Sequence, residues 1–258
     1  MKTKSLGFIG GGRVTKIFLQ AFSNKREGFK SVIVYDTNAD VLSSLKRSFP
    51  EITTVDSASI AAKQDYLFIA LHPPVIMETL EKIQSDVSKN TIVISLAPKV
   101  TIEKIGLKLN HVKAIARVIP NATSYINEGY NPVCFAKELP DSDKQTILKM
   151  LGSLGHTFEV AENKLEGYAI MSAMLPTYFW FQWNELQAIG IQIGLNEKEC
   201  TDSIHETLKA SLNLLYKSGL TALEVMDLIP VKPIAENEAQ IKDCFKSKLL
   251  PLFEKIKP

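Results

Sequence analysis

The chain has 258 residues, of which 45% are hydrophobic and 22% charged, a balance typical of a globular protein with one or two domains. Its 30 basic and 28 acidic residues give a formal net charge of +2 and form no basic block. We therefore expect neither a nucleic acid nor a membrane surface as a partner. The cysteines Cys134, Cys200 and Cys244 lack metal-ligand spacing, which predicts reduced thiols and no metal site.

The first residues predict neither a secretion signal nor a membrane span. Residues 10–13 interrupt the apolar run that follows the basic start, and no small-residue cleavage site comes after them. The richest later apolar run, 171–181, is too short for a membrane span and contains Pro176. We therefore expect a cytoplasmic protein.

Residues 6–36 are predicted to form a strand, a glycine turn, a helix and a second strand that ends in Asp36. Gly10 permits a tight turn, Gly12 lets backbone amides approach a pyrophosphate, and the helix N-terminus offers unpaired N–H groups. Thr15 replaces the third glycine of the dinucleotide fingerprint, but the flanking strands and the distant carboxylate supply its context. The alternative is a turn that only permits tight packing. The predicted cofactor-binding residues here are Gly10, Gly11, Gly12, Arg13, Val14 and Asp36.

Strands and helices continue to alternate up to about residue 160. Alternation of this kind predicts right-handed crossovers and a Rossmann-type, doubly wound parallel sheet, with ligands at the carboxyl ends of its strands. We assign this nucleotide-binding domain to residues 1–160. Its further predicted strands are 52–55, 65–71, 91–96, 112–118, 133–136 and 157–160, and its further helices are 38–48, 101–109, 141–154 and one that begins at Pro73.

Residues 161–258 are predicted to form a second domain that is entirely helical. The first long helix is apolar over much of its circumference, which indicates burial on several sides. Either a partner subunit covers it, in a homodimer built through this domain, or the first domain does. The predicted helices are 165–193, 197–217, 220–228 and 237–255.

Five segments together resemble the pyrroline-5-carboxylate reductases, nicotinamide-dependent enzymes that reduce a cyclic imine to proline. The resemblance covers nearly the whole chain, in order and at compatible spacing. The segments are 7–12 (GFIGGG), 70–73 (ALHP), 92–97 (IVISLA), 117–121 (RVIPN) and 172–178 (SAMLPTY).

The resemblance implies that the glycine turn holds the cofactor pyrophosphate, that Ala70, Leu71, His72 and Pro73 lie near the cofactor, and that Asn121 lies beside the nicotinamide. Taken alone, Asn121 after Pro120 is more typical of a turn residue that bonds its own backbone. The family usually has lysine where this chain has His72. A histidine can donate to phosphate or supply a proton, or it can be an ordinary loop residue.

Two segments depart from the family pattern. Residues 172–178 keep Ser172, Pro176 and Tyr178 of the family's Ser-Gly-Ser-Gly-Pro-Ala-Tyr stretch but lose both glycines. Residues 228–234 stand where the family has a Thr-Ser-Pro-Gly-Gly-Thr-Thr substrate loop, and they contain neither glycine nor threonine. Two prolines cannot rebuild an anion site made of backbone N–H groups. Lys232 is either a substitute point charge or a solvated lysine. We therefore expect a substrate other than pyrroline-5-carboxylate.

The cofactor is expected to be NAD(P)H. Asp36 is placed to bond a ribose 2′-hydroxyl and to repel a 2′-phosphate, which favours NAD, whereas Arg13 offsets that repulsion. The family resemblance favours NADP. Choice between the two stays open at the level of sequence.

Two functions are consistent with these residues. The first is an NAD(P)H-dependent reductase that transfers hydride to an imine or carbonyl of a small molecule, with Ser172, His72 and Tyr178 as candidate proton donors. Ser172 is equally typical of a hydroxyl bonded to a helix carbonyl, whereas Tyr178 is more typical of a core aromatic with its hydroxyl at the edge. The second is a non-catalytic NAD(P)-binding sensor or assembly protein, because the substrate loop is lost.

Overall fold

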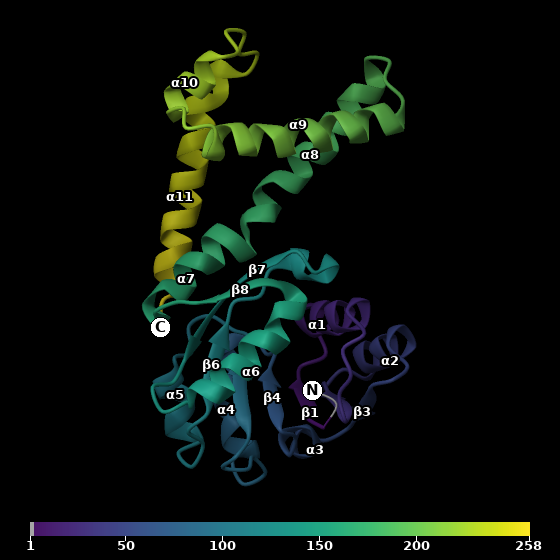
Figure 1. Cartoon of the computed structure of the whole chain (residues 1–258), viewed down its shortest axis with the longest axis vertical. Coiled ribbons are helices and arrows are strands. Elements are labelled where there is room, and N and C mark those ends of the chain that lie inside the picture. The colour runs from purple at the N-terminus through teal and green to yellow at the C-terminus, as the bar shows by residue number, and fades with distance from the viewer. Residues whose placement is uncertain (1–2) are drawn as a thin grey trace. The chain divides into compact units, whose positions relative to one another are not determined.

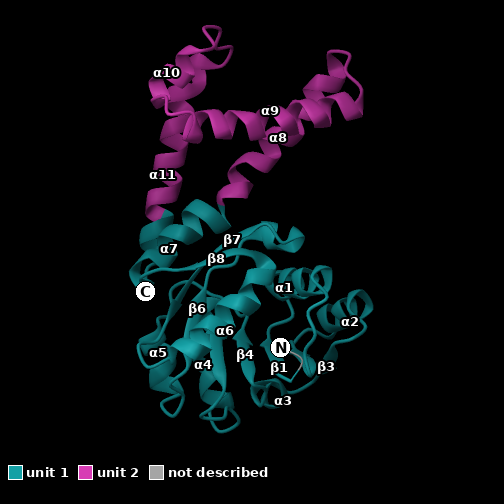
Figure 2. Cartoon of the chain, viewed as in Figure 1, with its two compact units in different colours: residues 1–174, 252–258 teal, residues 175–251 magenta. Residues whose placement is uncertain are grey.

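The structure is a computed structural model that describes residues 3–258 and divides into two compact units (Figure 2). Unit 1 comprises Met1–Met174 and Leu252–Pro258, and unit 2 comprises Leu175–Pro251. The boundary differs from the one predicted at residue 160. Leu165 and Ala169 are buried in a cluster with Ile119 and Cys134, so the segment after residue 160 still belongs to unit 1.

Unit 1 is built on one eight-stranded sheet with the order β3-β2-β1-β4-β5-β6-β7-β8. Neighbouring strands are parallel except for β6 and β7, which are antiparallel. The connection between these two strands is too short for a crossover helix, so the chain returns in the opposite direction. The strands are β1 (Ser5–Ile9), β2 (Ser31–Tyr35), β3 (Thr53–Val55), β4 (Tyr66–Ile69), β5 (Ile92–Ser95), β6 (Ile115–Val118), β7 (Gly129–Phe135) and β8 (Gly155–Glu159).

Helices cover both faces of this sheet (Figure 1). One buried cluster joins the sheet to α1, α2 and α6, and the other joins it to α3, α4 and α5. This confirms the predicted doubly wound architecture, although α3 was not predicted. The helices are α1 (Arg13–Asn24), α2 (Ala39–Ser48), α3 (Ala58–Ala62), α4 (Pro73–Ile83), α5 (Ile102–Lys108), α6 (Asp141–Leu151) and α7 (Leu165–Tyr168), with short helical turns η1 (Ala122–Ile126), η2 (Gly152–Leu154), η3 (Glu162–Lys164) and the π-helical η4 (Ala169–Ala173).

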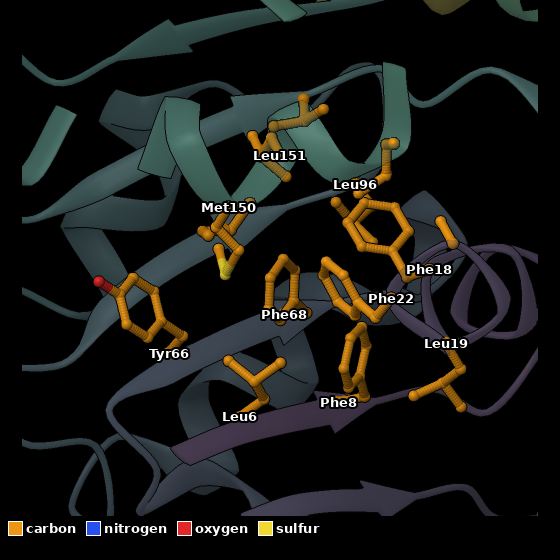
Figure 3. Close-up of a cluster of buried hydrophobic side chains, with 14 of the residues drawn as sticks. Leu6, Phe8, Phe18, Leu19, Phe22, Tyr66, Phe68, Leu96, Met150 and Leu151 are labelled. Carbon is orange, nitrogen blue, oxygen red and sulfur yellow. The ribbon is translucent and has the colours of Figure 1, made fainter. Parts of the chain in front are cut away.

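Side chains of the central strands alternate between the two faces. Phe8 of β1 and Phe68 of β4 belong to the first cluster, where their rings stack with centroids 4.5 Å apart (Figure 3). The next residues along each strand, Ile9 and Ile69, belong to the second cluster. Burial on both faces explains why these strands are apolar without interruption in the sequence.

Unit 2 is entirely helical, as predicted. Its helices are α8 (Leu175–Gln192), α9 (Glu197–Lys217), α10 (Ala222–Asp227) and α11 (Glu238–Ile256), with a 3-10 turn η5 (Ala235–Asn237). Residues 252–256 at the end of α11 belong to unit 1. Asn196 and Thr221 begin α9 and α10 with capping boxes. The single helix predicted over 165–193 is interrupted, because Met174 N–H donates to the Ala169 carbonyl across a π-helical turn. Within residues 3–258, no helix combines the length and apolar character needed to cross a bilayer.

Candidate functional site

The glycine turn after β1 requires glycine at its first position. Gly10 has a φ of +103°, and its N–H donates to the Tyr35 carbonyl at 2.8 Å. A Cβ atom at this position would lie 2.3 Å from the carbonyl oxygen of Ala70. Both the left-handed backbone and the close approach of the chain after β4 therefore exclude a side chain.

Thr15 accounts for the missing third glycine of the fingerprint. Its side chain is fully buried, and its hydroxyl donates to the Gly10 carbonyl at 2.5 Å. In the standard motif a glycine here permits close packing between helix and strand. In this chain the threonine hydroxyl bonds the turn itself, so the turn keeps its shape despite the larger residue.

Gly12 leaves open space in front of α1. It is the N-cap residue of this helix, and a Cβ atom added to it would meet no heavy atom within 4 Å. The first N–H groups of a helix have no partner within the helix and carry its positive dipole end. An open helix N-terminus behind a glycine turn fits the pyrophosphate of a dinucleotide.

A cleft of about 690 Å³ lies in front of this turn. Three of its walls follow parallel strands: 11–14 after β1, 70–73 after β4 and 96–98 after β5. The cleft therefore lies where a doubly wound sheet binds its ligand. Sequence reasoning missed the wall at 96–98, which the carboxyl end of β5 could have indicated, and the wall from α2 formed by Val41, Ser44 and Leu45.

Asp36, at the end of β2, is anchored beside the glycine turn. One carboxylate oxygen accepts the Gly11 N–H at 2.7 Å, and the other accepts the Asn38 N–H at 2.8 Å. Within residues 3–258 no ion pair involves Asp36. Its negative charge is thus held in place by two backbone amides and is not neutralised by a neighbouring cation.

His72 is the one predicted catalytic residue that lines the cleft in unit 1. It is exposed at the N-cap of α4, whose first position is Pro73. Its side chain makes no capping hydrogen bond to that helix. The imidazole is therefore free to turn toward a bound ligand.

The structure brings Asn121 and Ser172 together, but their side chains form hydrogen bonds to other groups of the protein. The Asn121 Nδ2 donates to the Ser172 carbonyl at 2.8 Å, and its Oδ1 accepts the Thr123 N–H at 2.9 Å. The Ser172 hydroxyl donates to the Tyr130 carbonyl at 3.0 Å. Both side chains are buried. These bonds tie the π-helical η4 to β7 and to the residue that begins η1.

Tyr178 lies in α8 of unit 2, where its ring packs edge-on against Phe245 with centroids 6.1 Å apart. Burial raises the pKa of its hydroxyl. The segment 228–234, which differs from the family's substrate loop, also belongs to unit 2. Together with α11 it lines a mostly apolar pocket of about 380 Å³, to which it contributes Ile229, Lys232, Pro233 and Ile234.

A buried ion cluster behind the cleft was not predicted. The fully buried Arg117 of β6 bonds Glu166 at 2.6 Å and Glu162 at 2.9 Å. The same Glu166 oxygen accepts the N–H of Lys99, which has a φ of +75°. Lys99 directly follows the cleft wall at 96–98. This cluster therefore fixes the end of that wall to β6 and α7.

The thiols and possible metal ligands offer no second site. All three cysteines are free, as predicted, and burial raises the pKa of Cys134 to about 12. No group of three or more His, Cys, Asp or Glu side chains that could hold a metal ion occurs among residues 3–258.

Comparisons with known proteins agree with this geometry. Residues 5–99 match the family model described as NADP oxidoreductase coenzyme F420-dependent. The pyrroline-5-carboxylate reductase of Haemophilus influenzae is 22% identical over 231 residues, covering 88% of this chain and 83% of that protein. The Staphylococcus haemolyticus enzyme is 21% identical over 256 residues, covering 94% of each.

Solved structures show the same fold. Plasmodium falciparum pyrroline carboxylate reductase with NADP bound has a TM-score of 0.79 at 20% identity, with 99% of this chain and 96% of that chain covered. A prephenate dehydrogenase from A. aeolicus in complex with NAD+ has a TM-score of 0.56 at 12% identity, with 98% and 91% covered. The resemblance found in the motifs is confirmed: the chain is similar in sequence to the pyrroline-5-carboxylate reductases over most of its length and shares their fold.

Proposed function

We propose that this chain is an NAD(P)H-dependent oxidoreductase of the pyrroline-5-carboxylate reductase type, which reduces an imine or carbonyl of a small molecule. The observation that carries the proposal is the cleft at the carboxyl ends of β1, β4 and β5, with an open helix N-terminus at Gly12. The similarity to these reductases over most of the chain supports it. The alternative of a non-catalytic nucleotide-binding protein rests only on the lost loop.

The residues at the cleft fit a nicotinamide dinucleotide. The N–H groups at the start of α1 face the open space at Gly12 and suit the pyrophosphate, with Arg13 and Lys16 adding positive charge. Leu71 and Ala97 supply apolar walls farther along the strand ends. When bound, the nicotinamide supplies a hydride, and the protein positions the carbon that receives it.

Reduction of a C=N or C=O group also consumes one proton, which must reach the nitrogen or oxygen. We assign His72 as the first candidate donor, because it lines the cleft and has no capping bond. Ser172 is a second candidate that must first release its bond to the Tyr130 carbonyl. Tyr178 is a third, whose hydroxyl has a pKa raised by burial.

The substrate is proposed to differ from pyrroline-5-carboxylate. Ile229, Val231 and Ile234 are exposed apolar side chains where the relatives' loop has hydroxyls and glycines. Pro230 and Pro233 in the same segment have no N–H to donate, so the segment cannot form a backbone cradle for a carboxylate. A small imine or carbonyl with a less anionic, more apolar body matches this segment better.

The helical region 161–258 is proposed to hold the substrate and to form a homodimer. Unit 2 exposes several large apolar side chains in a single chain: Trp180 is 48% exposed, Phe181 68% and Ile193 75%. Such an apolar surface is typical of a subunit interface. A location in the cytoplasm follows from the reduced thiols and belongs to the same proposal.

One experiment tests the proposed reaction. Purified protein is titrated with NADPH and NADH, and cyclic imines with and without a carboxylate, pyrroline-5-carboxylate among them, are then added to the same cuvette. Cofactor binding followed by oxidation of the nicotinamide on adding an imine or carbonyl is the expected result. Binding without oxidation across the whole panel supports the non-catalytic alternative, and no binding overturns both.

The role of His72 is tested with two variants. His72→Ala is expected to lower kcat at least about tenfold, the lower part of the range for a general acid. His72→Lys restores the residue type usual in the relatives and is expected to recover much of the rate. Equal rates for all three proteins contradict the assignment.

A further inference from the structure

We propose that Asp36 makes this enzyme selective for NADH over NADPH, an inference that rests on the proposed nucleotide site. The residue stands at the end of β2, and its two carboxylate oxygens are anchored by the N–H groups of Gly11 and Asn38. Both anchors are backbone groups. The carboxylate therefore cannot swing away without leaving two amides unpaired.

The position of this carboxylate relative to the cleft follows from Gly11. A Cβ atom on Gly11 would lie 3.3 Å from the Cβ of Asp36, 3.2 Å from Val41 and 3.1 Å from Leu45. Gly11, Val41 and Leu45 line the cleft. Asp36 thus borders the part of the cleft between the glycine turn and α2, where the ribose that carries the adenine belongs in this fold.

The two anchoring bonds leave capacity for a ligand. A carboxylate offers about four acceptor positions, and two are used by Gly11 and Asn38. The remaining positions suit the 2′- and 3′-hydroxyls of the adenosine ribose. A 2′-phosphate at the same place would bring a second anion against a carboxylate that forms no ion pair within residues 3–258.

Two cations near the cleft do not reverse this preference. Arg13 and Lys16 both line it and belong to the first turn of α1. The pyrophosphate, present in both cofactors, lies at that helix end and already carries two negative charges. These side chains are therefore expected to strengthen NADH and NADPH binding alike.

The test measures binding of NADH and NADPH by calorimetry to three proteins. The wild type is expected to bind NADH at least about tenfold more tightly, as expected for juxtaposed like charges. Asp36→Asn keeps one acceptor oxygen, removes the charge and is expected to abolish most of this ratio. Asp40→Asn, which removes an exposed carboxylate from the first turn of α2, is the matched control and should leave the ratio unchanged.

The outcomes separate this inference from the proposed function. Binding of both cofactors with no preference for NADH, or an unchanged ratio in Asp36→Asn, overturns the role of Asp36 and leaves the reductase intact. Absence of binding by either cofactor overturns both. Because Asp36→Asn can fail to fold, wild-type protein is also titrated with 5′-ADP and 2′,5′-ADP. Weaker binding of the fragment with the 2′-phosphate supports the inference, and equal binding contradicts it.

Discussion

The two units of this chain place their apolar side chains differently. Unit 1 buries apolar residues on both faces of its sheet in two large clusters. In unit 2, among the residues that the structure describes, only Cys200 is buried, and its long helices α8 and α11 bury no side chain. The comparison teaches that an apolar helix is not by itself a core. Unit 1 carries its own stabilising interior, whereas unit 2 leaves large apolar side chains exposed in a single chain.

The largest expected effect comes from the core of unit 1. Phe68→Ala should destabilise the protein by about 3 to 5 kcal/mol, the usual cost of removing a buried phenyl ring. Phe181→Ala in unit 2 removes a ring that is 68% exposed in one chain and should cost little at high dilution. Urea unfolding over a range of protein concentrations measures both.

The concentration dependence decides what covers unit 2. If two copies associate through it, the cost of Phe181→Ala rises with protein concentration, and light scattering gives the mass of a dimer. A monomeric mass at micromolar concentration would contradict the proposed homodimer. If the protein is a monomer and Phe181→Ala lowers the free energy of unfolding as much as Phe68→Ala does, the two units do not differ in this way.

The second effect concerns charge. Glu166→Gln leaves Arg117 buried with less compensation and should cost about 3 kcal/mol or more. The matched change in unit 2, Glu238→Gln, removes the exposed partner of Lys242 and should leave the unfolding midpoint unchanged. Thermal unfolding followed by circular dichroism measures both. Similar shifts for the two variants would show that burial does not set the energy of these pairs.

The third effect is on binding rather than stability. Gly12→Val places a side chain in the open space before α1. Losing about one hydrogen bond to the pyrophosphate should make cofactor binding about tenfold weaker. The fold should lose only about 1 kcal/mol, the cost of a poor N-cap. Gly152→Ala at the end of α6, also a substitution with no neighbour within 4 Å and at a right-handed backbone position, should leave cofactor affinity unchanged. Unchanged affinity in Gly12→Val would place the nucleotide elsewhere.

The smallest effect is acid sensitivity. The pKa of Asp65 lies below its ordinary value of 3.8, chiefly because its carboxylate accepts the Ser5 N–H. A lowered pKa in the folded state contributes stability above pH 3.8 that is lost as the pH falls below it. Asp65→Asn should therefore flatten the acid limb of the stability curve of unit 1.

Glu224 is the residue of unit 2 to compare with Asp65 of unit 1. Its pKa is lowered by the same kind of bond, from the N–H of Thr221, but that bond caps the end of its own short helix. Glu224→Gln should change helicity near α10 and leave the unfolding of unit 1 unchanged between pH 3 and 5, roughly the range in which carboxyl groups titrate. An equal effect on unit 1 would contradict the separation of the two units.

Much of unit 1 could be predicted because its signals are local. Strands buried on both faces are apolar without a break, and each glycine or proline turn marks a strand end. The helix α3 was missed because five residues are too few to show a helical period. The strand at 133–136 was predicted, but its antiparallel direction relative to β6 was missed, since direction depends on the length of the connection rather than on the strand itself.

The parts of the site that directly follow strands could also be predicted. Residues 10–14 and 70–73 follow strands directly, so their convergence could be inferred, and the cleft contains most of them. The bond from Arg117 to Glu166 spans 49 positions and belongs to no motif, so the sequence does not reveal it. The sequence alone left two interpretations of Asn121, a residue beside the nicotinamide or a turn residue. In the structure its side-chain amide donates to the Ser172 carbonyl and accepts from the Thr123 N–H, so both of its polar atoms bond the protein.

The end of the chain has a consequence for synthesis. Leu252–Pro258 belongs to unit 1, and Ile256 packs against the cluster of Ile119, Cys134, Leu165 and Ala169. Unit 2 is therefore inserted within unit 1 rather than appended to it. A nascent chain cannot complete this cluster until residues 252–258 have been synthesised, so unit 1 begins folding before unit 2 is made and is completed after it.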